Sequence, residues 1–361
     1  MPAWAARSAC LPPALQTSMQ PCWECQQRLA MQGRARHAPV AAAARTAQAS
    51  SARVISRRPE FVSVKDMEVA SVEQPIIQWY PGHVAAAEKK LQEHLSRVDV
   101  VFDVRDARIL RSTQHPRIAQ WTKGKRRFVL VNRSDMVSQK DQKLWRQHFQ
   151  QAGQTVFFVN GQTGEGITHV KKAAAQVSES ANTSRSRRGL KPRPVRACVI
   201  GFPNIGKSAL INRLLGRKAV ASYKKPGVTK ALQWVRMGDA LDLLDSPGII
   251  PSHLKDQRTA TKLAICNDIG EAAYLNSAVA AEFLGLLRSL PSAKSLWPVV
   301  KKRYQFSVWA ETAEDMLEEL AERLFQGNVE QAGQRILTDY RNVRLGRFAL
   351  EAPAEKVSGK R

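Results

Sequence analysis

The chain has 361 residues, of which 43% are hydrophobic and 7% aromatic, an ordinary composition for a globular protein. Its 56 lysines and arginines outnumber 31 acidic residues and give a formal net charge of +25. That balance is typical of proteins that bind nucleic acid and is unusual for metabolic enzymes. No apolar run approaches the roughly 18 residues of a membrane span, so neither a transmembrane segment nor a secretory signal is expected.

Residues 1–59 differ from the rest of the chain. They contain eight arginines, no lysine and a single acid, Glu24, among Ala, Ser, Gln and Pro. This composition resembles an organelle transit peptide, and we expect the segment to be disordered and to lie outside the fold. The remaining 48 basic and 30 acidic residues still give residues 60–361 a charge of +18. The mature protein is therefore expected to bind a phosphate-rich partner.

The five cysteines do not form a disulfide framework. Cys10, Cys22 and Cys25 lie in the leader, and Cys198 and Cys266 are far apart in the chain. Cys22 and Cys25 have the spacing of half a zinc site, but no second pair completes four ligands. A reduced compartment and no structural bridge are therefore expected.

The first half of the chain alternates between strand and helix patterns. Amphipathic helices are predicted over residues 84–98 and 138–152. Near-continuous apolar runs predict buried parallel strands at residues 98–107, 128–132 and 155–160. This alternation is typical of a doubly wound sheet. Residues 178–194 are rich in Ser, Arg and Pro and are expected to form a linker or an exposed loop.

The second half begins with strands and continues with helices. Short buried strands are predicted at residues 195–200, 232–237 and 240–245, and a helix that Gly216 can end follows the first of them. From about residue 255 the pattern is helical, as two sets of residues that each share one helix face indicate: Val279, Phe283, Leu287 and Leu290, and then Leu317, Leu320 and Leu324. Thr312 and Asp315 have the spacing of a helix cap. A small helical domain is expected here.

A phosphate-binding motif, GFPNIGKS, occupies residues 201–208 between a predicted strand and a predicted helix. Glycines let backbone N–H groups turn toward phosphates, Lys207 supplies a positive charge to the β and γ groups, and Ser208 can ligate Mg²⁺. The helix start favours anions as well. We expect the nucleotide to contact Asn204, Ile205, Gly206, Lys207, Ser208 and Ala209.

Two further segments are candidates for the magnesium shell and the γ-phosphate. Asp245 ends an apolar strand and Gly248 follows three residues later, so the carboxylate can hold Mg²⁺ while the glycine N–H contacts the γ-phosphate. Thr229, in the segment PGVT, can reach the same metal. Each segment taken alone also fits an ordinary turn, so these assignments depend on the phosphate loop beside them.

The segment VNRSD, residues 131–135, has the pattern of a guanine-reading loop. The Asp135 carboxylate can accept two hydrogen bonds from guanine, and Asn132 can tie the loop in place. Asn, Ser and Asp also favour plain strand-to-helix turns, which is the alternative. In familiar GTPases such a loop follows the phosphate loop, whereas here it precedes it by about seventy residues.

The order of these motifs resembles one family. VNRSD, VNGQTG, GFPNIGKS, PGVTK and DSPG, preceded by IQWYPGH and VRDAR, are similar to the circularly permuted YlqF/RbgA family of ribosome-assembly GTPases, and most of all to its plastid DAR GTPase branch. The likeness covers residues 76–350 and includes CNDIGEAAY, RILTDYR and LGRFALE. Because packing and not chain order sets the neighbours in a parallel sheet, a permuted chain can build the same nucleotide site. Asn160 and Gly161 then join the expected nucleotide contacts.

The resemblance implies an architecture and a role. It implies an α/β fold with a permuted P-loop GTPase sheet, doubly wound and mostly parallel, followed by a small all-α domain. The expected boundaries are a transit peptide at 1–59, the GTPase domain at 60–254, a helical RNA- or ribosome-binding domain at 255–350 and a disordered tail at 351–361. It also implies a monomer that hydrolyses GTP on the large ribosomal subunit of an organelle, in the chloroplast stroma or alternatively the mitochondrion.

The charge is unevenly distributed between these expected domains. Residues 255–361 hold 16 basic and 14 acidic residues, so nearly all of the positive charge lies in residues 60–254. The GTPase domain is therefore expected to provide much of the attraction for ribosomal RNA.

The catalytic candidates depend on the resemblance. Ile249 and Ile250 stand where Ras-like enzymes have a glutamine that orients water, and the resemblance implies that His83 takes over this role. The alternative is that His83 has only a structural role in its Pro-Gly turn. The resemblance also implies that Asn204 can hold K⁺. Arg133 departs from the usual lysine of this motif, and its guanidinium can either stack on the base or span to the phosphate loop.

Two other classes of function stay open at this stage. One is a P-loop ATPase or small-molecule kinase, for which the VNRSD segment would be a coincidence. The other is an RNA-binding scaffold that binds the nucleotide without hydrolysing it. Comparing the affinities for GTP and ATP addresses the first, and turnover stimulated by ribosomal subunits addresses the second.

Overall fold

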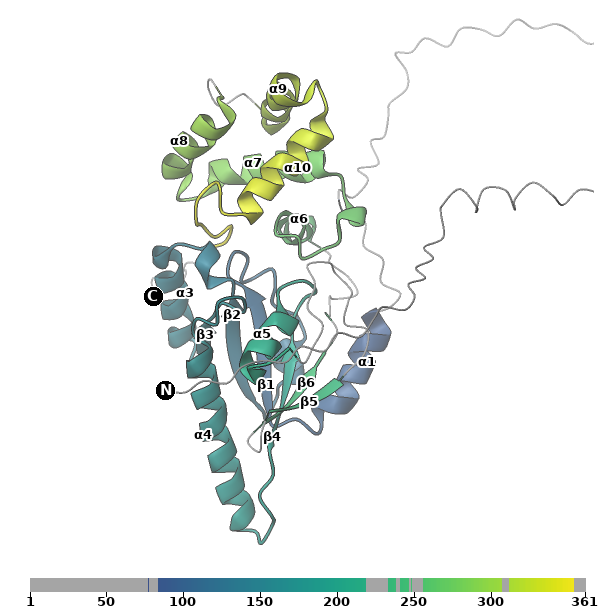
Figure 1. Cartoon of the computed structure of the whole chain (residues 1–361), viewed down its shortest axis with the longest axis vertical. Helices are drawn as coiled ribbons and strands as arrows, with labels where there is room; N and C mark the ends of the chain where they lie inside the picture. The colour runs from purple at the N-terminus through teal and green to yellow at the C-terminus, as the bar shows by residue number, and fades with distance from the viewer. Residues whose placement is uncertain are drawn as a thin grey trace, which may run out of the picture. The chain divides into compact units, whose positions relative to one another are not determined.

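The computed structural model describes residue 77 and residues 84–218, 233–237, 241–246, 248, 256–306 and 312–353 (Figure 1). All of them belong to one compact unit, residues 71–361. The expected transit peptide, residues 1–59, and residues 354–361 of the expected tail lie outside the described residues. None of the described helices combines the length and apolar character needed to cross a membrane.

Six strands form one sheet in the order β3-β2-β1-β4-β6-β5. Their bounds are β1 Val100–Asp106, β2 Arg126–Asn132, β3 Thr155–Phe158, β4 Val195–Ile200, β5 Gln233–Met237 and β6 Leu241–Asp245. Every neighbouring pair is parallel except β5 and β6, which are antiparallel. The mostly parallel sheet predicted from the apolar runs is therefore confirmed.

Helices cover both faces of this sheet. On one face, α1 Val84–Leu95, α2 Ile118–Trp121 and α3 Gln139–Gln151 pack on strand residues such as Val101 and Val129. On the other, α4 Ile167–Ser186 and α5 Lys207–Leu215 pack on residues such as Phe102 and Val199. Because successive strand residues point to opposite faces, strands buried on both sides must be apolar throughout, as β1, β2 and β4 largely are. The sheet is doubly wound, as expected.

Helix α4 corrects one prediction. Residues 178–186 were expected to belong to a linker or loop, but they form the last part of this helix, and only residues 187–194 connect it to β4. Ser and Thr hydroxyls within the helix donate to carbonyls of the preceding turn, as Thr183 does to Glu179 at 2.9 Å and Ser184 to Ser180 at 3.0 Å. Polar side chains that bond back in this way are compatible with a helix, and no Gly or Pro interrupts the segment.

The C-terminal part is helical, and we call α6 to α10 the helical region. Its helices are α6 Gln257–Ile265, α7 Asn276–Ser289, α8 Ala293–Tyr304, α9 Ala313–Phe325 and α10 Val329–Arg341. Val279, Phe283 and Leu287 are buried along α7, and the Thr312–Asp315 capping box opens α9, both as predicted. Figure 1 shows α7 to α10 gathered together.

Leu324 shares a helix face with Leu317 and Leu320, as predicted, but it is not buried with them. Its side chain is 57% exposed, whereas the other two are buried. Leu324 has the helical phase of the buried face, but it lies in the last turn of α9, where no described residue covers it. Elsewhere the predicted stop of α5 is confirmed, since Gly216 caps the helix with a φ of 71°. Cys198 and Cys266 are free, and both are buried.

The residues that follow α10 return to the sheet. Beyond α10, the Leu350 N–H donates to the Arg108 carbonyl at 2.8 Å, in the loop that follows β1. The Glu351 carboxylate accepts from the Arg111 N–H at 2.7 Å and from the Ser112 hydroxyl at 2.5 Å. One apolar cluster also includes residues of both the sheet and the helical region. The helical region is therefore anchored to the loop after β1.

Candidate nucleotide site

The phosphate loop, residues 201–208, joins β4 to α5 and encloses the amine of Lys207. The Lys207 side chain is only 7% exposed, and its Nζ donates to the carbonyls of Phe202 at 2.8 Å and Gly201 at 3.2 Å. Burial lowers the pKa of Lys207 to about 8, although Asp245 and Asp268 oppose this shift. Ser208 and Ala209 lie in the first turn of α5. The N–H groups at the start of a helix have no carbonyl partner within the helix, so this position favours an anion.

Asn132 joins three segments that the sequence keeps apart. It ends β2, and its side-chain amide donates to the carbonyl of Ile205, 73 residues later, at 2.7 Å. Its side-chain oxygen accepts from the N–H of Gly161 at 2.9 Å. Gly206 has a φ of 91°, and a Cβ there would lie 2.5 Å from the Asn132 amide nitrogen. The base-reading loop, residues 132–135, therefore lies directly against the phosphate loop despite the reversed order.

The other predicted base contacts flank this junction. Asp135 lies in the short 3-10 helix η3, Ser134–Met136, and its side chain is exposed. Asn160 is buried, and its side-chain oxygen accepts from the N–H groups of Gln162 at 2.8 Å and Thr163 at 3.1 Å. The Asn160 side chain thus shapes the loop that presents Gly161, and the role of both residues toward a base stays a prediction.

Asp245 has the environment of a cation ligand. It ends β6 with 1% exposure, and neither carboxylate oxygen has a hydrogen-bond partner among the described residues. Burial raises the pKa of Asp245 to about 6, against the effect of Lys207. A buried carboxylate without donors is costly unless a cation or a proton satisfies it, and carboxylate and hydroxyl oxygens are the ligands that Mg²⁺ prefers. This donor chemistry fits the predicted metal.

Gly248 lies against the phosphate loop. A Cβ at this position would be 2.5 Å from the Pro203 Cα, so only glycine permits so close an approach of the two backbones. Four residues discussed in the sequence analysis lie outside the described residues: His83, Thr229, Ile249 and Ile250.

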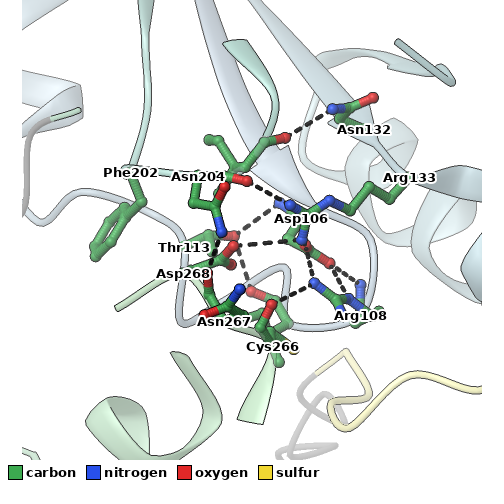
Figure 2. Close-up of polar contacts among 12 residues, drawn as sticks. Asp106, Arg108, Thr113, Asn132, Arg133, Phe202, Asn204, Cys266, Asn267 and Asp268 are labelled. Carbon is green, nitrogen blue, oxygen red and sulfur yellow. Dashed lines mark hydrogen bonds and ion pairs between the residues drawn. The ribbon is translucent and has the colours of Figure 1, made fainter. Parts of the chain in front are cut away.

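Arg133 spans to the phosphate loop, the second of the two arrangements expected for it. Its Nη2 donates to the carbonyl of Asn204, and its Nη1 contacts the carboxylates of Asp106 at 2.7 Å and Asp268 at 3.4 Å (Figure 2). The side-chain amide of Asn204 in turn donates to the carbonyl of Asn267. The predicted potassium ligand is therefore in contact with the turn that follows α6.

Two buried carboxylates in this network were not singled out from the sequence. Asp106 and Asp268 have no exposed surface. Although burial opposes ionisation, Arg108 and Arg133 lower the pKa of Asp106, whereas burial and the neighbouring Asp106 raise the pKa of Asp268. Charged residues at the end of an otherwise apolar strand, VRDAR, were the available signal for Asp106. For Asp268 the available signal was the segment CNDIGEAAY, which contains it and belongs to the family likeness.

A six-stranded, mostly parallel sheet with a phosphate loop at a helix start and a base-reading loop earlier in the chain defines the class of circularly permuted P-loop GTPases. Comparisons with known proteins agree with this class. Residues 196–282 match the family model described as "50S ribosome-binding GTPase". The chain is 32% identical over 286 residues to "Ribosome biogenesis GTPase A" of Bacillus licheniformis, an alignment that covers 78% of this chain and 99% of the relative.

More distant relatives carry organelle names. "Short integuments 2, mitochondrial" of Arabidopsis thaliana is 27% identical over 58% of this chain and 56% of its own length. "Mitochondrial ribosome-associated GTPase 1" of Bos taurus is 33% identical over 54% of this chain and 60% of its own. The crystal structure of GNP-bound YlqF from T. maritima has the same fold, with a TM-score of 0.50 and 21% identity over 74% of this chain and 98% of that one.

The chain belongs to the ribosome biogenesis GTPase A (YlqF/RbgA) family. It is accordingly a GTPase, an enzyme that hydrolyses GTP to GDP and phosphate.

Proposed function

We propose that this GTPase assists the assembly of the large ribosomal subunit of an organelle, and that it belongs to the plastid DAR GTPase branch and acts in the chloroplast, with the mitochondrion as the alternative. One observation carries the nucleotide part of the proposal: Asn132 bonds both Ile205 and Gly161, so the base-reading and phosphate loops form one site. The arginine-rich, lysine-free leader and the organelle names of relatives support the location.

In the proposed complex, the guanine base contacts the exposed carboxylate of Asp135 and the backbone of the loop that carries Asn160 and Gly161. The phosphates bind the N–H groups at the start of α5. The Lys207 amine exchanges the carbonyls of Gly201 and Phe202 for phosphate oxygens, and with a pKa of about 8 it stays largely protonated at neutral pH. A charged amine held against the phosphates stabilises negative charge that develops during transfer.

Magnesium and potassium are the proposed cations. Ser208, Thr229 and Asp245 would hold Mg²⁺, which when bound neutralises charge on the β- and γ-phosphates. The Asp245 carboxylate, which has no hydrogen-bond donor in the described part of the chain, supports this assignment. Asn204 is the proposed potassium ligand. K⁺ would bind the side-chain oxygen of Asn204, while the side-chain nitrogen donates to the carbonyl of Asn267.

His83 is the proposed residue that orients the attacking water. The isoleucines at 249 and 250 have no side-chain atom that can hydrogen-bond to water, so another group must supply this function. Gly248 would contribute its N–H to the γ-phosphate. We propose that hydrolysis is slow until ribosomal contacts order the site.

A basic hairpin supports the proposal of an RNA partner. It consists of the C-terminal end of α4 and residues 187–194, which connect α4 to β4. Arg187, Arg188 and Lys191 are exposed there, and residues 180–194 contain no acid. The hairpin has fixed geometry, because Arg193 bonds Asp99 at 2.8 and 2.9 Å and Arg185 donates to the Lys191 carbonyl at 3.0 Å. In Figure 1 this end of α4 extends past the strands. Exposed cations on a fixed support suit the phosphate backbone of RNA.

Sedimentation with isolated organellar subunits tests the proposal. The full chain with a non-hydrolysable GTP analogue is expected to migrate with the large subunit, whereas Lys207→Ala, which cannot hold the nucleotide, is expected to stay in the soluble fraction. Arg187→Glu/Arg188→Glu/Lys191→Glu is expected to weaken binding. It should also reduce the slope of log affinity against log salt by about 0.7 to 0.9 for each RNA phosphate that is no longer neutralised.

Co-migration with the small subunit would overturn the assignment of the partner. Equal support of binding by ATP and GTP would overturn the assignment of the base. Lys301→Glu/Lys302→Glu on α8 compares the contribution of the helical region, which is also expected to contact RNA, with that of the hairpin. Chloroplast and mitochondrial subunits used side by side address the location.

A further inference from the structure

Arg133 connects three parts of the molecule through one guanidinium group. We propose that it is a positioning residue for GTP hydrolysis, which couples the phosphate loop to the helical region through Asp268. This proposal depends on the GTPase activity of the chain and not on the ribosomal partner. The proposed role of Arg133 and the proposed ribosomal partner can therefore be tested and rejected independently.

The geometry of the link begins at the end of β2. Arg133 follows Asn132 directly and has a φ of 60°, a left-handed conformation that is uncommon for residues other than glycine. This backbone turn directs the side chain away from the base-reading loop toward the phosphate loop. Two different nitrogens are used: Nη2 for the Asn204 carbonyl, and Nη1 for the Asp106 carboxylate at 2.7 Å and the Asp268 carboxylate at 3.4 Å (Figure 2).

The turn after α6 forms the other side of the link. Its three residues, Cys266, Asn267 and Asp268, each contact the GTPase part of the chain. The carbonyl of Cys266 accepts from Arg108 at 2.9 Å, the carbonyl of Asn267 accepts from the Asn204 amide, and Asp268 contacts Arg133. Asn204 is therefore connected to the helical region in two ways. Its side chain contacts Asn267 directly, and its carbonyl accepts from Arg133, which contacts Asp268. A displacement of Asn204 changes both contacts together.

The two carboxylates that Arg133 contacts are not held equally. Asp106 also receives two bonds from the Arg108 side chain, at 2.8 and 3.0 Å, and it would keep these if Arg133 were removed. Asp268 has one oxygen 3.4 Å from Arg133 and another without a hydrogen-bond partner anywhere in the described part of the chain. The backbone N–H of Asp268 donates to the Leu263 carbonyl at 2.8 Å, but among the described residues its carboxylate accepts a hydrogen bond from Arg133 alone. If the phosphate loop moves and displaces Arg133, we therefore expect the Asp268 carboxylate to shift more than the Asp106 carboxylate.

The usual lysine of this motif cannot make the same link. A lysine has one ammonium nitrogen, whereas the planar guanidinium presents separate donors to separate acceptors at once. Lysine at position 133 could reach the Asn204 carbonyl or the carboxylates but would not hold both in the observed arrangement. The alternative role for Arg133 is a contact with the base, which would leave the helical region unaffected by its replacement.

The test uses the isolated full-length chain with GDP and with a non-hydrolysable GTP analogue. Hydrogen exchange over residues 263–270 is expected to differ between the two nucleotides in the original protein. Arg133→Lys and Asp268→Asn are each expected to abolish that difference. In Arg133→Lys the kcat of intrinsic GTP hydrolysis is expected to fall about 10- to 100-fold, because the phosphate loop loses its support, while the KM for GTP changes less than about threefold.

Matched controls separate positioning from folding. Arg335→Lys removes an arginine that also pairs with a buried carboxylate, Asp339, at 3.0 Å, and it is expected to alter neither the nucleotide-dependent exchange nor kcat. The double variant Arg133→Lys/Asp268→Asn is expected to be no worse than Arg133→Lys, because both changes break one link. Asp268→Asn keeps the side-chain shape and tests the link if the Arg133 variant fails to fold.

The proposal would be overturned if Arg133→Lys or Asp268→Asn kept the nucleotide-dependent exchange at residues 263–270. It would also be overturned if Arg133→Lys raised the KM for GTP with kcat unchanged, since that result assigns Arg133 to the base. Additive losses in the double variant would show that the two residues act separately.

Discussion

Asp268 and Asp339 are both carboxylates of the helical region without exposed surface, but their surroundings differ. Asp339, on α10, accepts from the guanidinium of Arg303 at 2.6 and 2.7 Å, from the Tyr304 hydroxyl at 3.1 Å and from Arg335 at 3.0 Å. The carboxylate of Asp268, after α6, has a single hydrogen bond, from Arg133 at 3.4 Å, and its other oxygen has no partner among the described residues.

The difference indicates that Asp339 stabilises the fold, whereas the position of the Asp268 carboxylate depends on the nucleotide site. The partners of Asp339 come from α8, from α10 and, as Arg344, from the segment after α10, so its bonds tie several parts of the helical region together. The single contact of Asp268 crosses from the helical region to the base-reading loop. Burying a carboxylate with few donors reduces stability, and such sites persist where function uses them. Asp339 is thus expected to govern unfolding, and Asp268 the response to nucleotide.

The largest expected effect tests the first half of this comparison. Asp339→Ala is expected to lower the free energy of unfolding by about 3 kcal/mol, because it removes several charge-assisted hydrogen bonds between α8 and α10. Urea unfolding measures this change. The kcat of intrinsic GTP hydrolysis per folded molecule should stay within about twofold of the original value. A large fall in kcat with little change in stability would reverse the roles assigned to the two carboxylates.

Acid should loosen the GTPase part before it disrupts the cluster around Asp339. His115 is buried and stacked on Trp121, and its Nδ1 accepts from the Arg117 N–H at 3.2 Å. Burial, and then the charge of Arg117, lower the pKa of His115 to about 4 from 6.5. Because the folded state disfavours protonation, the stability due to neutral His115 is complete above pH 6.5 and is lost as the pH falls toward 4.

The expected loss of stability from His115 is roughly 1 to 3 kcal/mol over that window. It is measured as the difference in the pH dependence of urea unfolding between the original protein and His115→Gln, which removes the titration. Although burial opposes ionisation of Asp339, its bonds from Arg303 and Tyr304 lower its pKa, so the cluster around it stays ionised over the same window. Identical pH slopes for the two proteins would contradict the prediction.

The smallest expected change in stability completes the comparison. Asp268→Asn should alter the free energy of unfolding by less than about 1 kcal/mol, because loss of the 3.4 Å ion pair with Arg133 is offset by removal of the cost of burying a charge. Thermal unfolding and urea unfolding of the same sample would measure it. A change as large as that expected for Asp339→Ala would show that Asp268 stabilises the fold and would weaken its assignment to the link.

Local sequence predicted most of the elements from which the site is built. The apolar runs at 98–107, 128–132 and 195–200 could only be strands buried on both faces, and GFPNIGKS between a strand and a helix has a geometry set by its glycines and its lysine. The capping box at Thr312 and the stop at Gly216 were equally local. The predictions failed where the pattern was ambiguous, as in residues 178–186, and the shared helix face of Leu324 did not indicate that its side chain is exposed.

By itself the sequence determined that this chain would form a doubly wound sheet with a phosphate loop, because the periodicity of apolar residues and the special backbone of glycine act over a few residues. Only the tertiary structure decided which segments meet. Asn132 bonds the carbonyl of Ile205, Arg133 that of Asn204, and Asn204 that of Asn267. Every residue carries a backbone carbonyl, so such partners leave no mark in the sequence, and the choice among them is made by the packing of strands and helices distant in the chain.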